Sequence, residues 1–96
     1  DIVYEDELAI AFKDISPQAP VHILVIPKKQ ISKLSDSTNQ DQELLGHLLL
    51  VVKKITTDEN ILDYRVAINN GAEAGQTVFH LHLHILAGRT FGWPPG

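Results

Sequence analysis

The chain has 96 residues, which suits one domain, and it has no cysteine, so disulfides cannot stabilise it. Its formal net charge of -4 argues against a broad nucleic-acid surface, which needs clustered lysine and arginine. No apolar run approaches the roughly 20 residues of a membrane span, and no signal-peptide pattern is present, so we expect a cytoplasmic protein without nucleic-acid or membrane partners.

The first part of the chain is predicted to form three strands. Residues 1–5 alternate between apolar and polar side chains, and residues 8–13 resume a strand pattern after a two-residue turn, which predicts a hairpin. Two prolines mark residues 14–20 as a loop. Residues 22–26 are apolar and rich in β-branched side chains, and they predict a third strand.

One long helix and two more strands are predicted after a polar connector. Ser37, with Gln40 three residues later, fits a capping box. Leucine, valine and isoleucine then recur at helical spacing over residues 44–55 and form one broad apolar face. Residues 64–69 and 78–87 have strand patterns on either side of a glycine-bounded loop.

The order of these elements predicts an α+β domain. Three strands, one helix and two strands suggest a five-stranded antiparallel sheet with the helix on one face. Because one helix covers only one side of a sheet, we expect the other side to be free for a ligand.

The sequence HLHLH, residues 80–84, contains three of the five histidines. On a strand, alternate residues point to opposite faces, so the three histidines are expected to share one face. The opposite face is apolar and is expected in the core; it consists of Phe79, Leu81, Leu83 and Ile85. The last strand is therefore expected to have one face that packs in the core and one face whose histidines can take part in binding or catalysis.

Three interpretations of the histidines compete. The first interpretation is a solvent-exposed sheet face that carries histidines without a function. It explains a single histidine better than three histidines in strict alternation. A zinc site is a second interpretation, but His80 and His84 lie about 13 Å apart at roughly 3.3 Å per residue, and no carboxylate is an obvious third ligand. Catalysis is the third: a neutral imidazole attacks phosphorus, and a neighbouring imidazolium stabilises the phosphoryl oxygens or protonates the leaving group. The chain has no P-loop.

The sequence HLHLHIL resembles the signature of the histidine triad (HIT) superfamily, in which histidines alternate with apolar residues. Residues 12–32, residues 69–89 and the terminal WPPG are similar to the Hint branch, the histidine triad nucleotide-binding proteins. The resemblance implies a single HIT domain over residues 1–96, without the N-terminal helix that usually precedes this point. It also implies a homodimer with a ten-stranded sheet, in which Val51 and Val52 could serve the interface and Trp93 lies near the partner's active site.

The resemblance implies an adenosine 5′-monophosphoramidase. Such an enzyme cleaves nucleoside 5′-phosphoramidates and aminoacyl- or lysyl-adenylates through a covalent nucleotidyl-histidine, with a purine nucleotide such as AMP as its ligand. No cofactor is required, and zinc at the histidines would be adventitious. Two alternatives stay open: a non-catalytic nucleotide-binding adaptor and a dinucleoside polyphosphate hydrolase. The ending GRTFGWPPG favours the Hint branch over the latter.

Roles for individual residues also follow from the resemblance. His82 is expected to be the nucleophile, with its other ring nitrogen held by a backbone carbonyl. His84 is expected to assist the leaving group, while His80 occupies the first triad position and His22 lies beside the triad on a separate strand. Thr77 is the remaining residue expected in catalysis. The other residues expected to bind the nucleotide are Asp14, Ile15, Asn69, Gly75, Gln76 and Val78.

Two of these expectations have a simple chemical basis. Asp14 is expected to accept hydrogen bonds from the ribose hydroxyls, because a carboxylate offers two acceptors; alternatively it only caps its loop. The backbone N–H groups and the hydroxyl of the segment 75–77 are expected to contact the phosphate, since glycine lets backbone donors approach an anion closely. His47, at the rim of the helix's apolar face, is expected to pack or to lie at the surface.

Overall fold

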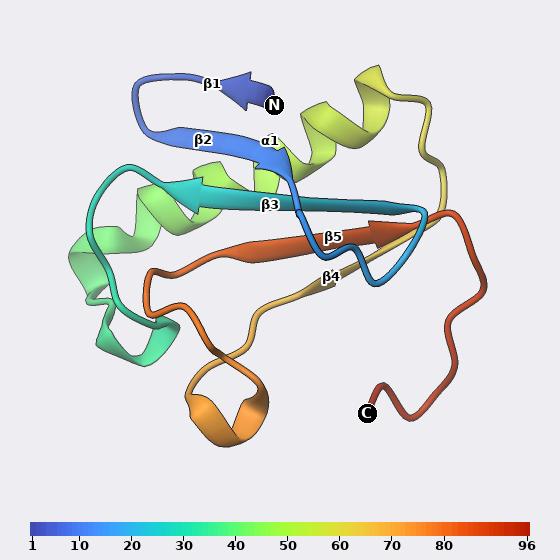
Figure 1. The fold of residues 1–96 in the computed structure, drawn as a ribbon. Helices are drawn as coiled ribbons and strands as arrows, with labels where there is room; N and C mark the ends of the chain where they lie inside the picture. Colours follow the sequence, from blue (N-terminus) through green and yellow to red (C-terminus); the bar gives the residue numbers. More distant parts are fainter.

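The computed structural model describes residues 1–96 as a five-stranded antiparallel sheet with one long helix against it (Figure 1). The strands are β1 (Ile2–Glu5), β2 (Ala9–Lys13), β3 (Val21–Pro27), β4 (Tyr64–Ala67) and β5 (Leu83–Ala87). They lie in the order β1-β2-β3-β5-β4. The helix α1 spans Gln42–Asp58, and the short 3-10 helices are η1 (Leu34–Asp36), η2 (Asn39–Asp41) and η3 (Ala72–Ala74). The predicted α+β architecture is confirmed.

The turn that leads into α1 is capped one residue later than predicted. The Ser37 hydroxyl donates to the Leu34 carbonyl at 2.6 Å and is therefore used at the end of η1. The capping box is formed by Thr38 and Asp41: the Thr38 side chain accepts from the Gln40 N–H at 3.3 Å, and the Asp41 carboxylate accepts from the Thr38 N–H at 2.9 Å. The box predicted at Ser37 and Gln40 is wrong, although a box does precede the helix.

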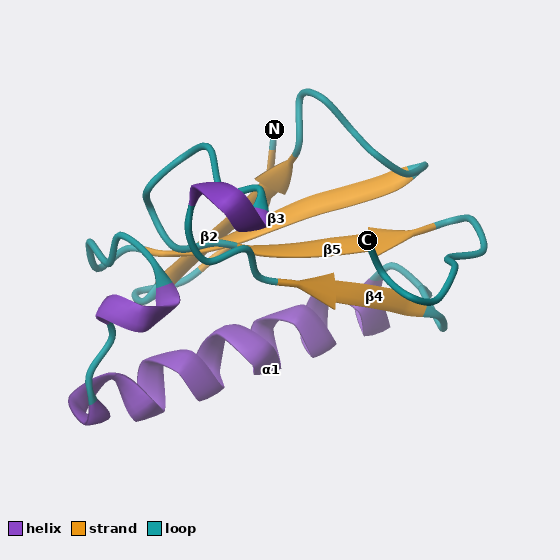
Figure 2. Cartoon of the chain, turned by 90° about the horizontal axis from the view of Figure 1, so that it is seen from below, coloured by secondary structure: helices purple, strands orange, loops and turns teal.

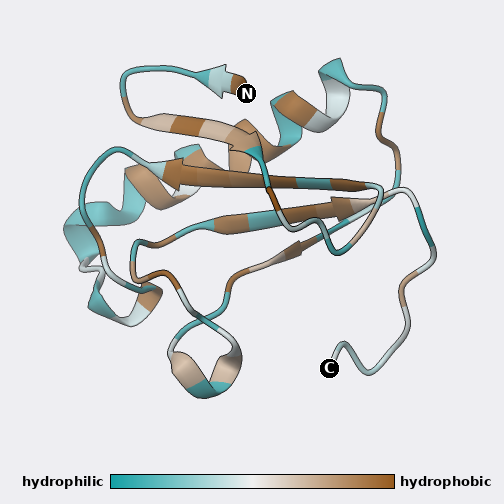
Figure 3. Cartoon of the chain, in the orientation of Figure 1, coloured by the Kyte–Doolittle hydropathy of each residue, from teal (hydrophilic) through white to brown (hydrophobic).

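The core lies between α1 and the sheet. Figure 2 shows α1 on one side of the sheet and the loop with η3 on the opposite side, and Figure 3 shows that β3 and β5 are mostly hydrophobic. The buried residues of the core are Ala9, Ala11, Ile23, Val25, Ile31, Leu48, Val51, Val52, Ile55, Leu81, Leu83 and Ile85. Burial of each large aliphatic side chain stabilises the fold by about 1.5–3 kcal/mol. No helix of the chain has the length and the apolar character needed to cross a membrane.

The apolar face of α1 is used inside the subunit. Val51 and Val52 are 2% and 3% exposed, because they belong to the face that packs on the sheet. The expectation that they are available to a subunit interface is therefore wrong. The large apolar residues that α1 exposes are Leu49 and Leu50, which are 54% and 64% exposed.

The last strand is shorter than predicted. β5 pairs with β3 only from Leu83 onwards. β3 ends at Pro27, which has no N–H to continue the ladder, and the Leu81 N–H donates instead to the Ile31 carbonyl at 2.7 Å. Leu81 is still buried as predicted, but Phe79 is 47% exposed and lies outside the core. The first two triad histidines therefore precede the strand, and other contacts must hold them.

Candidate active site

A cavity of about 550 Å³ is lined by residues of the sheet face opposite α1. Along β3, Ile23 and Val25 are buried in the core, so His22 and Leu24 point to the opposite face by strand alternation. The loop 14–18 and the segment that follows η3 complete the lining. The predicted residues that line the cavity are Asp14, Ile15, His22, Asn69, Gly75, Thr77, Val78, His82 and His84. His80 and Gln76 do not line it.

The position of His82 depends on hydrogen bonds made by the residue two places before it. The His82 Nδ1–H donates to the His80 carbonyl at 2.7 Å, as expected for the nucleophile. The His80 Nε2–H in turn donates to the Pro27 carbonyl at 2.9 Å. We assign these protons from the hydrogen-bond network. His80 therefore positions His82 beyond the end of the β3–β5 ladder, and a direct catalytic role for His80 is not supported. His82 keeps a free lone pair on Nε2.

His22 and His84 are joined in a directed chain of hydrogen bonds. The Gln18 backbone N–H donates to His22 Nδ1 at 3.0 Å. A neutral imidazole has one donor and one acceptor, so an accepting Nδ1 places the His22 proton on Nε2. His22 Nε2 lies 2.9 Å from His84 Nδ1 and donates to it. The His84 proton is therefore on Nε2, which is buried and has no protein partner.

The surroundings of His84 favour its neutral form. Burial lowers its pKa most, and the neighbouring rings of His82 and His22 lower the pKa further, while Asp14 acts in the opposite direction. The ring centroids of His82 and His84 are 4.9 Å apart and meet edge to face. At neutral pH His84 thus offers a neutral Nε2–H rather than the imidazolium that the sequence interpretation expected.

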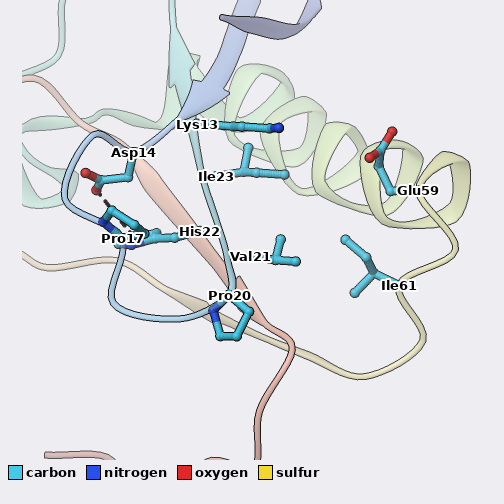
Figure 4. A pocket seen from close by; sticks show the side chains of 9 residues that line it. All are labelled: Lys13, Asp14, Pro17, Pro20, Val21, His22, Ile23, Glu59 and Ile61. Atoms are coloured by element: carbon cyan, nitrogen blue, oxygen red, sulfur yellow. Dashed lines mark ion pairs between the residues drawn. The ribbon is translucent and has the colours of Figure 1, made fainter.

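The two carboxylate oxygens of Asp14 have different surroundings. One carboxylate oxygen accepts from the Ser16 backbone N–H at 2.8 Å and caps the loop. The other oxygen lies 3.5 Å from His22 Nε2, at the edge of the 550 Å³ cavity. Figure 4 shows Asp14 and His22 side by side in the wall of a second cavity, of about 270 Å³. Asp14 and His22 thus line both cavities, and the second Asp14 oxygen takes no part in the loop cap.

Of the backbone donors predicted over residues 75–77, the loop with η3 leaves only the Thr77 N–H free. The N–H groups of Gly75 and Gln76 donate to the carbonyls of Ala72 and Gly71, at 3.0 Å and 3.1 Å. Gln76 is buried, and its side chain braces the loop through hydrogen bonds with Gly71, Ser32 and Val78. The backbone N–H groups of Thr77 and Val78 have no protein partner. We therefore expect an anion to be bound by these two donors rather than by Gly75 and Gln76.

The same cavity contains a set of candidate metal ligands. Asp14, His22 and His84 each place a ligand atom within 4.8 Å of the others, so the carboxylate that the sequence did not reveal is present. A histidine that binds a metal normally carries a proton on its second ring nitrogen and donates it outward. His22 Nδ1 instead accepts from the Gln18 N–H. The set therefore fits a proton relay better than a zinc site.

The sequence interpretation missed several parts of the cavity. Phe12 and Leu24 are register partners on β2 and β3, Leu24 is also the partner of His84, and both form apolar lining. The alternation of Leu24 with His22 is the signal that could have revealed this surface. Gln18 contributes through its backbone, which no side-chain pattern can reveal.

His47 lies in a separate cluster near the start of the sheet. Its Nε2 is 2.6 Å from Asp6, which also accepts from the Tyr4 hydroxyl at 2.7 Å. Burial raises the pKa of Asp6, but hydrogen bonds from Tyr4, the neighbouring backbone and His47 together hold it well below its usual range. His47 does not line the cavity and links α1 to the β1–β2 turn, in agreement with a structural role.

The fold and the site define a class of protein in which three ordered imidazoles, from β3, from β5 and from the residue just before β5, face one cavity. The chain belongs to the HIT domain family, whose model matches residues 1–91. It is 65% identical to an uncharacterized HIT-like protein of Synechocystis over 96 residues, which cover 99% of this chain and 84% of that protein.

Solved structures of the family are similar over most of the chain. A HIT family hydrolase from Legionella pneumophila is 45% identical with a TM-score of 0.96, and the match covers 99% of this chain and 87% of that one. A histidine triad nucleotide-binding protein from Candida albicans is 36% identical with a TM-score of 0.78, over 97% and 73% of the two chains.

Proposed function

We propose that this protein is a metal-independent hydrolase of nucleoside 5′-phosphoramidates and aminoacyl-adenylates, of the adenosine 5′-monophosphoramidase type. The observation that carries the proposal is the pairing of two imidazoles in one cavity: His82 with a free lone pair on Nε2, and His84 with a proton on Nε2. The hydrolase from Legionella supports hydrolysis, and the protein from Candida supports a nucleotide ligand. The likeness to the Hint branch supports the phosphoramidate substrate.

The chemistry follows from the positions of these protons. The reactive form carries one additional proton on the His22–His84 pair. His82 Nε2 attacks phosphorus, the P–N bond breaks, and His84 Nε2 gives its proton to the departing nitrogen, so that the pair becomes neutral and keeps the shared proton between His22 Nε2 and His84 Nδ1. In the second step the unprotonated His84 Nε2 takes a proton from water, the resulting hydroxide attacks phosphorus, and neutral His82 leaves. Both steps balance without a metal ion.

The proposal predicts AMP release from adenosine 5′-phosphoramidate in a buffer that contains a metal chelator. Every group that the chemistry needs belongs to the chain, so EDTA is expected to leave the rate unchanged. Chromatography of the products measures the release, with added zinc as the comparison. A protein that binds AMP but releases none from the phosphoramidate is an adaptor. Preferential cleavage of a dinucleoside polyphosphate identifies the other alternative.

Ribose recognition by Asp14 gives a second prediction. The Asp14→Asn variant is expected to bind AMP more weakly by about 1.5–3 kcal/mol, because a charged acceptor for the ribose diol is lost. Binding of 2′-deoxy-AMP is expected to weaken less, and calorimetry with both ligands measures the difference. The substitution also changes the contact between Asp14 and His22, but this change affects the binding of both nucleotides, so the comparison with 2′-deoxy-AMP isolates the contribution of the ribose hydroxyl. Equal losses for both ligands leave Asp14 with its loop-capping role alone.

We also propose that two copies of the chain form a homodimer. β4 is an edge strand, and its Tyr64, Val66 and the following Ile68 are exposed apolar side chains that a partner could cover. Pairing of two such edges would give a ten-stranded sheet. In the C-terminal tail, Trp93 has the Arg65 guanidinium carbon 5.9 Å from its ring centroid, but it is 82% exposed, so most of its surface could contact another subunit.

Removal of residues 92–96 tests the role of this tail. The tail lies outside the core, so its deletion is expected to leave the melting temperature nearly unchanged. Turnover or leaving-group selectivity is expected to change, because Trp93 is proposed to reach the partner's site. Light scattering of the full chain at micromolar concentration is expected to give the mass of a dimer. A monomer, or a dimer whose deletion variant has unaltered kinetics, contradicts this role.

A further inference from the structure

The hydrogen-bond chain of the site extends beyond the cavity to the C-terminal end of β5. It runs from His84 through His22 to the backbone N–H of Gln18. The carbonyl of the same residue, Gln18, accepts from Arg89, with Nη2 at 3.1 Å and Nε at 3.4 Å. Arg89 lies just beyond β5, and it is exposed and outside the cavity.

Other contacts hold the Arg89 guanidinium in this position. Its carbon lies 4.3 Å from the centroid of the Phe91 ring, and Nη1 donates to the Thr90 carbonyl at 3.2 Å. The preceding Gly88 has a φ of 93°, and a Cβ there would lie 2.8 Å from Pro20. The end of β5 and the loop 14–20 are thus in close contact at two successive residues. Arginine suits this place because its planar fork offers two donors to one acceptor.

We propose that Arg89 is a positioning residue for the histidine relay. It fixes the Gln18 backbone so that the Gln18 N–H stays on His22 Nδ1, and it thereby selects the tautomer of His22 and of His84. Arg89 touches neither the substrate cavity nor the reacting atoms. The inference rests on the proposed function for its kinetic consequence, but the tautomer itself can be measured without any substrate.

The tautomer decides whether His84 can assist the leaving group. If the Gln18 N–H is lost, the His22 proton is free to move to Nδ1, and Nε2 becomes an acceptor. His84 can then donate from Nδ1 to His22, which takes its proton away from Nε2. The cavity would face a ring nitrogen without a proton, and a poor leaving group would depart unassisted.

A second arginine of the chain provides a matched control. Arg65 is also a guanidinium that contacts the C-terminal segment: it donates to the Gly92 carbonyl at 3.0 Å and lies 5.2 Å from the Phe91 ring centroid. It makes no hydrogen bond to Gln18 or to any other residue of the loop 14–20. Arg65→Gln therefore removes a comparable tail contact without touching the relay.

The direct test is imidazole ¹H–¹⁵N NMR of the full chain, with the His22 signals assigned by their loss in His22→Gln. The wild type and Arg65→Gln are expected to show His22 protonated on Nε2. Arg89→Gln is expected to show a mixture of tautomers. Arg89→Lys, which keeps the charge and one donor nitrogen but loses the two-nitrogen fork, is expected to give an intermediate result. Thermal melting confirms that each variant is folded. An unchanged His22 tautomer in folded Arg89→Gln overturns the proposal.

Kinetics give an independent readout. Arg89→Gln is expected to lower kcat about 3–10-fold for an alkylamine phosphoramidate of AMP, and to change it less than about twofold for the p-nitrophenyl ester of AMP, whose leaving group needs no proton. An equal fall for both substrates overturns the positioning role. If the wild type hydrolyses neither substrate, the proposed function fails, while the tautomer measurement still tests Arg89.

Discussion

The His82→Asn substitution is expected to lower phosphoramidate turnover by about 10³-fold or more, since the attacking nitrogen is lost. Asparagine suits the test because its amide N–H can replace the Nδ1–H of His82 and keep the hydrogen bond to the His80 carbonyl, which is 2.7 Å long in the structure. The fold and AMP binding should therefore survive. Single-turnover kinetics measure the chemical step without the contribution of product release.

Two controls make this result specific to His82. The melting temperature and the dissociation constant for AMP should match those of the wild type, because the cavity keeps its other lining residues. His47→Asn changes a histidine outside the cavity and should retain activity. A His82→Asn variant with substantial activity contradicts the assignment of the nucleophile and transfers it to another histidine.

The next largest effect is expected from His84→Gln, and it should depend on the leaving group. Glutamine can donate a hydrogen bond but cannot give up its proton, so turnover of an alkylamine phosphoramidate is expected to fall by about 10²–10⁴-fold. The p-nitrophenyl ester of AMP should be affected by less than about tenfold, since its leaving group departs as an anion. Steady-state kinetics with both substrates give the ratio.

The comparison of substrates separates general acid catalysis from simple damage to the site. A misplaced His82 would slow both reactions equally, whereas the loss of a proton donor slows only the one with the basic leaving group. Equal losses therefore contradict the role of His84. Circular dichroism and AMP binding check that the variant is folded, which matters because the ring of His84 contacts both His22 and His82.

The sequence was sufficient for the architecture because its patterns are strong and local. The apolar spacing over residues 44–55 predicts the helix, and the alternation of Leu81, Leu83 and Ile85 with histidines predicts which face is buried. The capping-box error is local, by one residue, whereas the error in the last strand arises from contacts between distant segments. Phe79 is exposed because β5 pairs with β3 only from Leu83 onwards and β3 itself ends at Pro27. No pattern within residues 78–87 contains that information.

In the candidate site, too, local patterns could be predicted from the sequence, whereas contacts between distant segments could not. The histidines are evident from their spacing, and the resemblance to the HIT superfamily assigns them plausible roles. The protons that distinguish His82 from His84 are fixed by backbone groups of His80 and Gln18, which have no signature in a side-chain pattern. The carboxylate of Asp14 reaches His22 only through the packing of its loop, so a candidate ligand set appears in three dimensions that the sequence did not reveal.

The most direct test of the account is to identify the residue that becomes covalently modified. The wild type is mixed with adenosine 5′-phosphoramidate, quenched at alkaline pH during the first turnover and analysed by peptide mass spectrometry. An adenylyl group on His82, absent from the His82→Asn variant, is the predicted result. AMP release without any adduct, or an adduct on another histidine, would contradict nucleophilic catalysis by His82.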